Sequence, residues 1–121
     1  MVAPVVVTGN TAVVLAAETM PLPAVTFGEV LATSDLPGGV VNILTGRVAE
    51  VAPWLASHMD VNGIDLAGAG LDAGDLEAAA AENLKRVRRP AGPDTDWTAD
   101  PGTGPMLAFL ETKTVWHPVG L

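Results

Sequence analysis

The stretch GNTAVVLAAETMPLPAVTFGEVLATSDLPGGVVNILTG, residues 9–46, decides the fold. Residues 11–16 form a short apolar run with β-branched side chains, which is typical of a buried strand. Two prolines then open a helix over residues 24–33, and the sequence Asp-Leu-Pro-Gly-Gly ends it. Residues 40–44 are a second β-rich run. A strand, a helix and a strand in this order predict two parallel strands joined by a right-handed crossover.

The same alternation continues along the chain. We predict a helix over residues 47–58, a strand over 64–67, a helix over 75–83 and a strand over 85–88. Apolar residues at helical spacing indicate the inner faces. These are Val25, Val30 and Leu31 on the first helix, Val48, Val51, Ala52 and Leu55 on the second, and Leu76, Ala79, Ala80 and Leu84 on the third. We expect Trp54 to pack in the core, with adenine stacking as the alternative, and His58 to meet carbonyls at its helix end.

Composition limits the classes of function. A chain of 121 residues with 49% hydrophobic residues is one small domain with enough apolar residues for a core. A net charge of −8 argues against nucleic acid and anionic membranes as partners, and no apolar segment is long enough to span a bilayer. The absence of cysteine excludes disulfides, thiolate metal sites and a cysteine nucleophile within these residues. We therefore expect a cytoplasmic protein.

Many residues of the 9–46 stretch resemble a known sequence pattern. The matching positions are Gly9, Asn10, Thr11, Glu18, Pro21, Leu36, Pro37, Gly39, Val40, Asn42 and Gly46. In order and spacing they resemble the cofactor domain of the aldehyde dehydrogenase superfamily. The resemblance implies a three-layer, Rossmann-like α/β domain with a mostly parallel sheet, flanking helices and an extended C-terminal strand. It also makes residues 1–8 the end of a helix, although Pro4 and the three valines after it favour extended chain by themselves.

The resemblance implies a degenerate site for NAD or NADP. Its candidate residues are Glu18, which the family uses at the adenine ribose, and Gly68, Ala69 and Gly74 of the turn at the pyrophosphate. The family's ribose-binding lysine is replaced by Leu15, and its phosphate-facing serine by Ala69. The alternative to a phosphate-binding turn is a structural one, in which Asp72 and Asp75 start the next helix.

The resemblance implies no catalytic residue in this chain. Residues 83–87, Asn-Leu-Lys-Arg-Val, match the end of the cofactor helix and the strand after it, but Arg-Arg-Pro-Ala-Gly-Pro replaces the strand with the general-base glutamate. Residues 1–89 therefore read as a truncated cofactor domain and residues 90–105 as a Pro/Gly/Asp-rich connector, with Trp97 as a surface anchor. The spacing of Asp94, Asp96 and Asp100 does not fit a calcium loop, so we expect no metal.

Residues 106–121 form the third segment. Thr112, Thr114 and Trp116 alternate with Lys113 and Val115, a pattern typical of a strand. Residues 110–115 resemble the strand with which members of the superfamily pair with a neighbouring subunit. The implied partner is a second copy or a full-length aldehyde dehydrogenase subunit, and the alternative is pairing within the same chain.

Three functions are compatible with these residues. The first is a catalytically silent, aldehyde-dehydrogenase-like subunit that acts by association. The second is a subunit of an NAD-dependent oxidoreductase whose catalytic cysteine comes from a partner chain. The third is a small-molecule or nucleotide-binding module with its site at the carboxyl ends of the strands.

Overall fold

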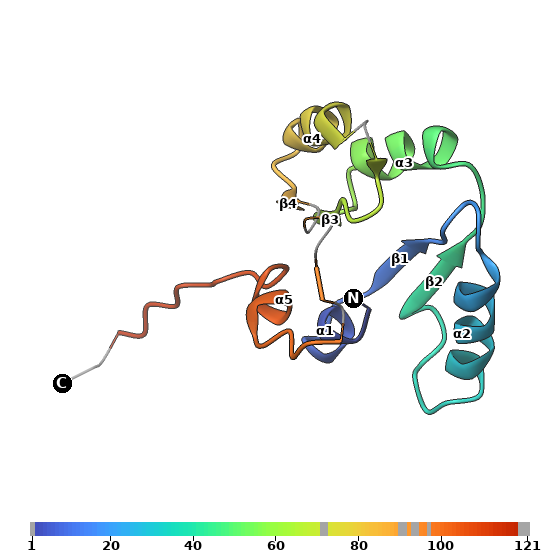
Figure 1. Cartoon of the computed structure of the whole chain (residues 1–121). Helices are drawn as coiled ribbons and strands as arrows, with labels where there is room; N and C mark the ends of the chain where they lie inside the picture. The colour runs from blue at the N-terminus through green and yellow to red at the C-terminus, as the bar shows by residue number, and fades with distance from the viewer. Residues whose placement is uncertain (1, 71–72, 90–91, 93–94, 97, 119–121) are drawn as a thin grey trace.

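The structure is a computed structural model that describes residues 2–70, 73–89, 92, 95–96 and 98–118. Short helices and strands alternate along the chain, which confirms the α/β, Rossmann-like class (Figure 1). In chain order the elements are α1 (Val2–Val7), β1 (Ala12–Leu15), α2 (Leu22–Ala32), β2 (Val41–Leu44), α3 (Val48–Ser57), β3 (Gly63–Asp65), α4 (Ala73–Ala81), β4 (Arg86–Arg88) and α5 (Gly104–Leu107). Among the described residues, no helix has the length and apolar character needed to cross a membrane.

The N-terminal residues form α1, as the resemblance implies, and the extended alternative was wrong. Pro4 lies in the first turn, where its missing N–H removes no helical hydrogen bond. The Thr8 hydroxyl donates to the carbonyl of Val5 at 2.8 Å, and Gly9, two residues after the end of the helix, has φ +87°. The left-handed backbone of Gly9 turns the chain toward β1.

The predicted crossover unit is confirmed. β1 and β2 are parallel, in a register that runs from Ala12 opposite Val41 to Leu15 opposite Leu44. The hydroxyl of Ser34 donates to the carbonyl of Leu31 at 2.7 Å and helps to end α2.

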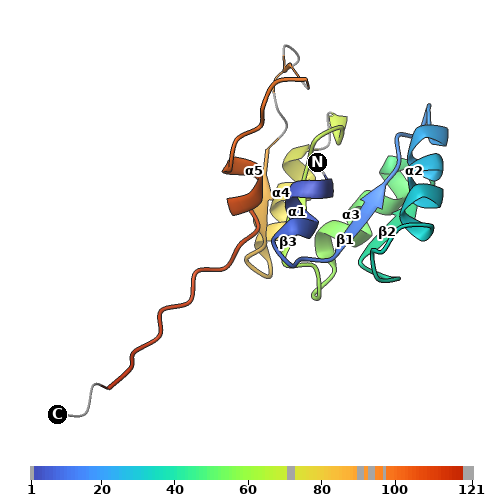
Figure 2. The ribbon, with the colours of Figure 1, turned by 90° about the horizontal axis from the view of Figure 1, so that it is seen from below.

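The four strands form two separate sheets and not the single sheet that we expected. β1 pairs only with β2, and β3 pairs only with β4, both in parallel. Figures 1 and 2 show the order β4, β3, β1, β2 from one side to the other. Among the described residues no further strand lies between β1 and β3, so α3, which contacts both β1 and α4, links the two halves.

The core is small and lies between α3, α4 and β3. Its fully buried members are Ala52, Ala56, Leu66 and Leu76, with Ala80 nearby on α4. The alanines allow α3 and α4 to approach closely, so they contribute less apolar area than larger side chains would. The total accessible surface is 8956 Å², whereas a compact monomer of this mass exposes about 6,100 Å².

Several predicted core residues are exposed. Trp54 is 75% exposed because Ala52 and Ala56, one helical turn apart, occupy the inner face of α3. Val25 and Val30 are exposed because α2 presents Gly28, Leu31 and Ala32 to β2. Leu84, at φ +58°, lies in the left-handed turn after α4 and is 90% exposed.

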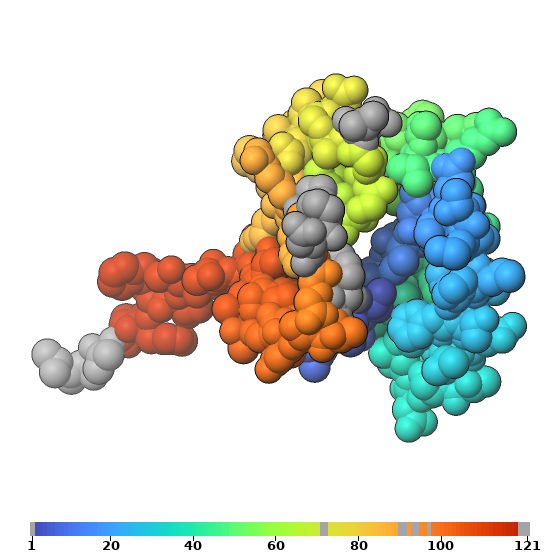
Figure 3. All heavy atoms as spheres, in the orientation of Figure 1, coloured from blue at the N-terminus to red at the C-terminus, as the bar shows by residue number. Residues whose placement is uncertain are grey.

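The predicted C-terminal strand has no strand partner in the structure. Residues 111–118 are exposed, without regular structure, and project away from the body (Figures 1 and 3). We call them the C-terminal arm. The alternative of pairing within the same chain is not what the structure shows.

Candidate functional site

Glu18 binds the start of α3. Its Oε2 accepts a hydrogen bond from the backbone N–H of Val48 at 3.0 Å. Val48 is the first residue of α3, where N–H groups have no helical partner and the helix dipole favours negative charge. The structure therefore gives the candidate ribose-binding carboxylate a capping role, while Leu15, at the family's lysine position, packs against the core.

We predict that Glu18→Ala lowers the free energy of unfolding by about 1 kcal/mol, because it removes a helix cap. Thermal or urea unfolding followed by circular dichroism measures this effect. The matched control is Glu29→Ala, since the exposed Glu29 carboxylate accepts no hydrogen bond from the described residues. Equal losses in the two variants would contradict the capping role.

Two backbone amides of the glycine turn, those of Ala67 and Ala69, form internal hydrogen bonds. The N–H of Ala69 donates to the carbonyl of Leu66 at 3.0 Å, and the N–H of Ala67 donates to Oδ1 of Asp65 at 2.9 Å. Gly68 has φ +83°, a backbone conformation that favours glycine. These amides are therefore not free to bind a phosphate, and Asp72 lies outside the described residues.

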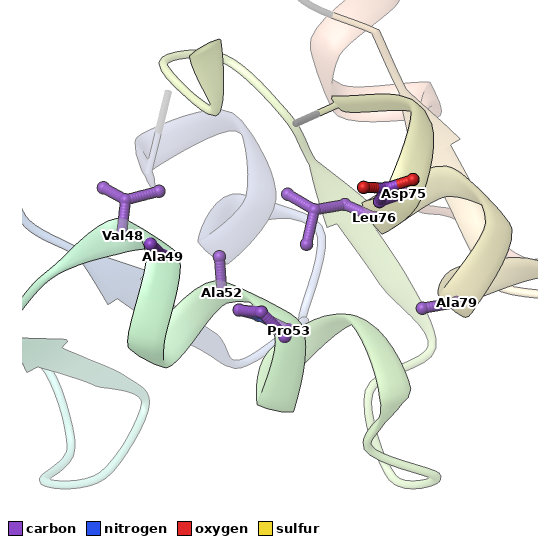
Figure 4. A pocket seen from close by; sticks show the side chains of 7 residues that line it. All are labelled: Val48, Ala49, Ala52, Pro53, Asp75, Leu76 and Ala79. Atoms are coloured by element: carbon purple, nitrogen blue, oxygen red, sulfur yellow. The ribbon is translucent and has the colours of Figure 1, made fainter. Parts of the chain in front are cut away.

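A cavity of about 220 Å³ lies between α3 and α4 (Figure 4). Val48 and Ala52 of α3 form one wall, and Leu76 and Asp75 of α4 form the other. Glu18 lies at the α3 end, because it is bound to Val48, and Gly74 precedes Asp75 in the first turn of α4. Neither Glu18 nor Gly74 lines the cavity itself; each is a neighbour of one lining residue. Among the described residues the lining is mostly apolar and includes no basic side chain.

Lys85 is a buried lysine that was not predicted from the sequence. Lys85 is 7% exposed, and its Nζ donates to the carbonyl of His58 at 2.6 Å and to Oδ1 of Asn83. Lys85 therefore ties the end of α3 to the turn after α4. We predicted that the imidazole of His58 contacts carbonyl groups at the end of its helix. Instead, its Nδ1 accepts a hydrogen bond from the backbone N–H of Asp60 at 3.2 Å.

The acidic loop is explained by its own turns. Oδ1 of Asp96 accepts hydrogen bonds from Thr98, whose hydroxyl lowers the pKa of that carboxyl, and Asp100 accepts the N–H of Gly102 at 2.8 Å. Within the described ranges no three acidic or histidine side chains are grouped for a metal ion. The predicted roles of Asp94 and Trp97 concern residues outside the described ranges.

A second hollow, also not predicted from the sequence, lies between α2 and β2. It has a volume of about 390 Å³ and is lined mainly by apolar residues of both elements and of the loop between them. Gly28 of α2 faces Ile43 of β2 here, since a Cβ added at Gly28 would lie 3.4 Å from Cδ1 of Ile43, an ordinary van der Waals contact. We call this hollow the α2–β2 groove.

Comparison with known proteins gives the family. The sequence profile of the aldehyde dehydrogenase family matches residues 1–93. The chain belongs to this family. It is 39% identical to aldehyde dehydrogenase 1A1 of Bos taurus, over 91% of this chain and 20% of that protein. It is 37% identical to an aldehyde dehydrogenase of Aspergillus niger (99% and 23%) and 36% identical to aldehyde dehydrogenase family 2 member C4 of Arabidopsis thaliana (89% and 20%). No solved structure matches the chain.

The chain spans about a fifth to a quarter of the length of these aldehyde dehydrogenases. The match to the Aspergillus protein covers nearly the whole chain within 125 aligned positions. The C-terminal arm is therefore aligned directly after the cofactor-domain residues. This match gives no support to the resemblance between residues 110–115 and the last strand of the family, which stays a prediction from the sequence.

Proposed function

We propose that this aldehyde-dehydrogenase-like chain acts by association, with a second copy or with a complete aldehyde dehydrogenase subunit, and performs no catalysis of its own. The observation that carries the proposal is the C-terminal arm. Val115 is 66% exposed and Trp116 is 90% exposed. An extended segment with exposed β-forming and aromatic residues is suited to pairing with a strand of another chain.

The base of the arm is fixed to the body. The ring of Phe109 lies on Gly63, where an added Cβ would be 2.6 Å from Cδ1 of the ring. The carboxylate of Glu111 lies 3.6 Å from the guanidinium of Arg86. The arm therefore leaves β3 and β4 from a defined point, which reduces the entropy that pairing would cost.

The rest of the surface also favours association. The chain exposes 8956 Å², roughly half as much again as a compact monomer of its mass. Exposed apolar side chains include Leu22, Val30 and Trp54. Extended apolar surface of this kind is typical of chains that bind a partner.

The absence of catalysis rests on the sequence. None of the 121 residues is a cysteine, and Arg-Arg-Pro-Ala-Gly-Pro stands at the family's general-base motif. A thiolate is the nucleophile that the resemblance implies, so it would have to come from outside these 121 residues. The chain alone is therefore expected to reduce no NAD in the presence of an aldehyde.

We predict that deleting residues 111–121 makes the chain monomeric, because it removes the segment available for pairing. Size-exclusion chromatography with light scattering, at matched concentrations, measures the mass of both chains. Trp54→Ala serves as the control, since it removes an exposed tryptophan from a different surface. If the shortened chain forms the same oligomer as the full chain, the proposal is contradicted.

The α3–α4 cavity favours a second candidate function, nucleotide binding. Two of its lining residues are next to candidate residues: Val48, whose N–H donates to Glu18, and Asp75, which follows Gly74. This position supports NAD or NADP as the ligand, with chemistry from a partner chain, or another nucleotide-like molecule. The carboxylate of Asp75, in the lining, opposes a phosphate at this cavity. Loss of a charge-assisted hydrogen bond costs about 1.5–3 kcal/mol, or one to two decades in affinity.

We therefore predict at most weak binding of NAD, without saturation below millimolar ligand, in a calorimetric titration. Ala69→Ser restores a hydroxyl at the pyrophosphate position and is expected to strengthen any binding that occurs. Micromolar binding by the unaltered chain would contradict this prediction and favour the NAD-dependent function. Binding of other nucleotides but not NAD would favour the small-molecule module.

A further inference from the structure

The α2–β2 groove has no role in the candidate cofactor site. It lies between α2 and β2, and shares no lining residue with the α3–α4 cavity. Leu31 of α2 and Val41 and Ile43 of β2 supply its apolar walls.

β2 is an edge strand, so half of its backbone groups are unpaired. The backbone N–H and C=O groups of Asn42 and Leu44 point toward β1. The ladder shows this alternation, because the N–H groups of Ala12 and Ala16 donate to the carbonyls of Val40 and Leu44. The N–H and C=O groups of Val41 and Ile43 therefore point to the free edge, where no described residue binds them. The side chains of these two residues line the groove. A strand added to this edge would place every second side chain beside the groove.

In the observed conformation, the C-terminal arm does not reach the α2–β2 groove of its own chain. It leaves the body on the side of β3 and β4, while β2 lies on the opposite side in both ribbon views (Figures 1 and 2). Seven extended residues, 112–118, span about 23 Å. A groove that receives the arm therefore belongs to a second copy.

Charge and pattern agree with this pairing. Residues 1–46, which form α1 to β2, contain Glu18, Glu29 and Asp35 but no lysine or arginine. Residues 112–118 contain Lys113 and no acidic residue. Opposite charges steer the two surfaces together, with a strength that falls as salt rises.

We infer that the C-terminal arm of one copy adds as a strand to the free edge of β2 in a second copy, with Trp116 in the α2–β2 groove. Thr112, Thr114 and Trp116 share one face of the arm, and this face turns to the groove. Trp116 is the anchor, because a tryptophan buried from 90% exposure contributes most of the apolar area. The inference rests on the proposed function and specifies its receptor.

Cross-linking tests the pairing directly, because the chain has no cysteine of its own. His117→Cys marks the arm, and Gly38→Cys marks the groove, where an added Cβ meets no atom within 4 Å. The two variants are mixed and oxidised. We expect the mixed disulfide, between His117→Cys and Gly38→Cys, in this mixture. We expect no mixed disulfide when Ala81→Cys, on the exposed end of α4, replaces Gly38→Cys. Equal yields with both positions would overturn the inference.

Affinity gives an independent test in the full chain. Ile43→Pro removes a free-edge N–H that the β1–β2 ladder does not use, and Ala32→Phe fills the groove. We expect Ile43→Pro, Ala32→Phe and Trp116→Ala each to weaken self-association at least tenfold in sedimentation velocity. The control Trp54→Ala is expected to leave self-association unchanged. Thermal unfolding shows whether Ile43→Pro stays folded. If Ile43→Pro is unfolded, Ala32→Phe still tests the groove. If only arm variants weaken association, the receptor lies elsewhere and the proposed function survives. If deletion of the arm has no effect, both are wrong.

Discussion

Replacing Leu66 with alanine is expected to lower the free energy of unfolding by about 2–5 kcal/mol. Leu66 is the largest fully buried side chain, at 2% exposure, and it packs among Ala52, Ala56 and Leu76. Its three neighbours are short or lie on rigid helices, so they cannot close the cavity that the substitution leaves. Urea unfolding followed by circular dichroism measures the loss.

The matched control for Leu66→Ala is Leu107→Ala on α5, which is 61% exposed. We expect this control to change the free energy of unfolding by about 1 kcal/mol or less, because little apolar area is lost. A domain with so small a core has little stability in reserve, so Leu66→Ala is expected to be largely unfolded at 37 °C. Similar losses for the two variants would show that the α3–α4 core does not hold the domain together.

Replacing Lys85 with methionine is expected to have the second largest effect, a loss of about 1–3 kcal/mol. Methionine keeps most of the apolar stem but cannot donate to the carbonyl of His58. The carbonyl of His58 and the Asn83 amide oxygen would lose their partner in a partly buried contact between the end of α3 and the turn after α4. Amide hydrogen exchange is expected to rise at the end of α3 and in the turn after α4.

Lys113→Met is the control for Lys85→Met, because Lys113 lies on the exposed arm. It is expected to leave the free energy of unfolding within about 0.5 kcal/mol of the parent. Faster exchange spread over the whole chain in Lys85→Met, and not concentrated at the two helix ends, would contradict the role assigned to Lys85.

The order and type of the secondary structure could be predicted from the sequence because local signals agree with one another. The proline pair before α2, the Asp-Leu-Pro-Gly-Gly turn after it and the two β-branched runs specify one crossover unit. These signals predict that β1 and β2 are parallel, and the structure confirms this pairing.

Burial was harder to predict, because it depends on which face of a helix finds a partner. Trp54 has an apolar ring, yet Ala52 and Ala56 occupy the contact with α4, where a large side chain would not fit. Leu84 is consistent with the helical pattern of α4, but the helix ends at Ala81 and the following turn directs it outward. Periodicity gives the spacing of residues and says nothing of the neighbour's size.

The candidate cofactor site stays a prediction from the family pattern. The family pattern identified Glu18 and the glycine turn, but only the structure shows that Glu18 binds Val48 and that Ala69 donates to Leu66. The α2–β2 groove gave no signal in the sequence. It arises where two elements meet across a crossover, with Gly28 opposite Ile43.

Sedimentation equilibrium of the unaltered chain, alone and mixed with a complete aldehyde dehydrogenase, tests the central claim most directly. We predict that the mass of the chain alone rises above that of one protomer as its concentration increases, or that the chain sediments with the complete enzyme. Both results follow from an exposed arm that pairs with a strand of another subunit. A constant mass of 12.3 kDa under all these conditions would contradict the proposal that this chain acts by association.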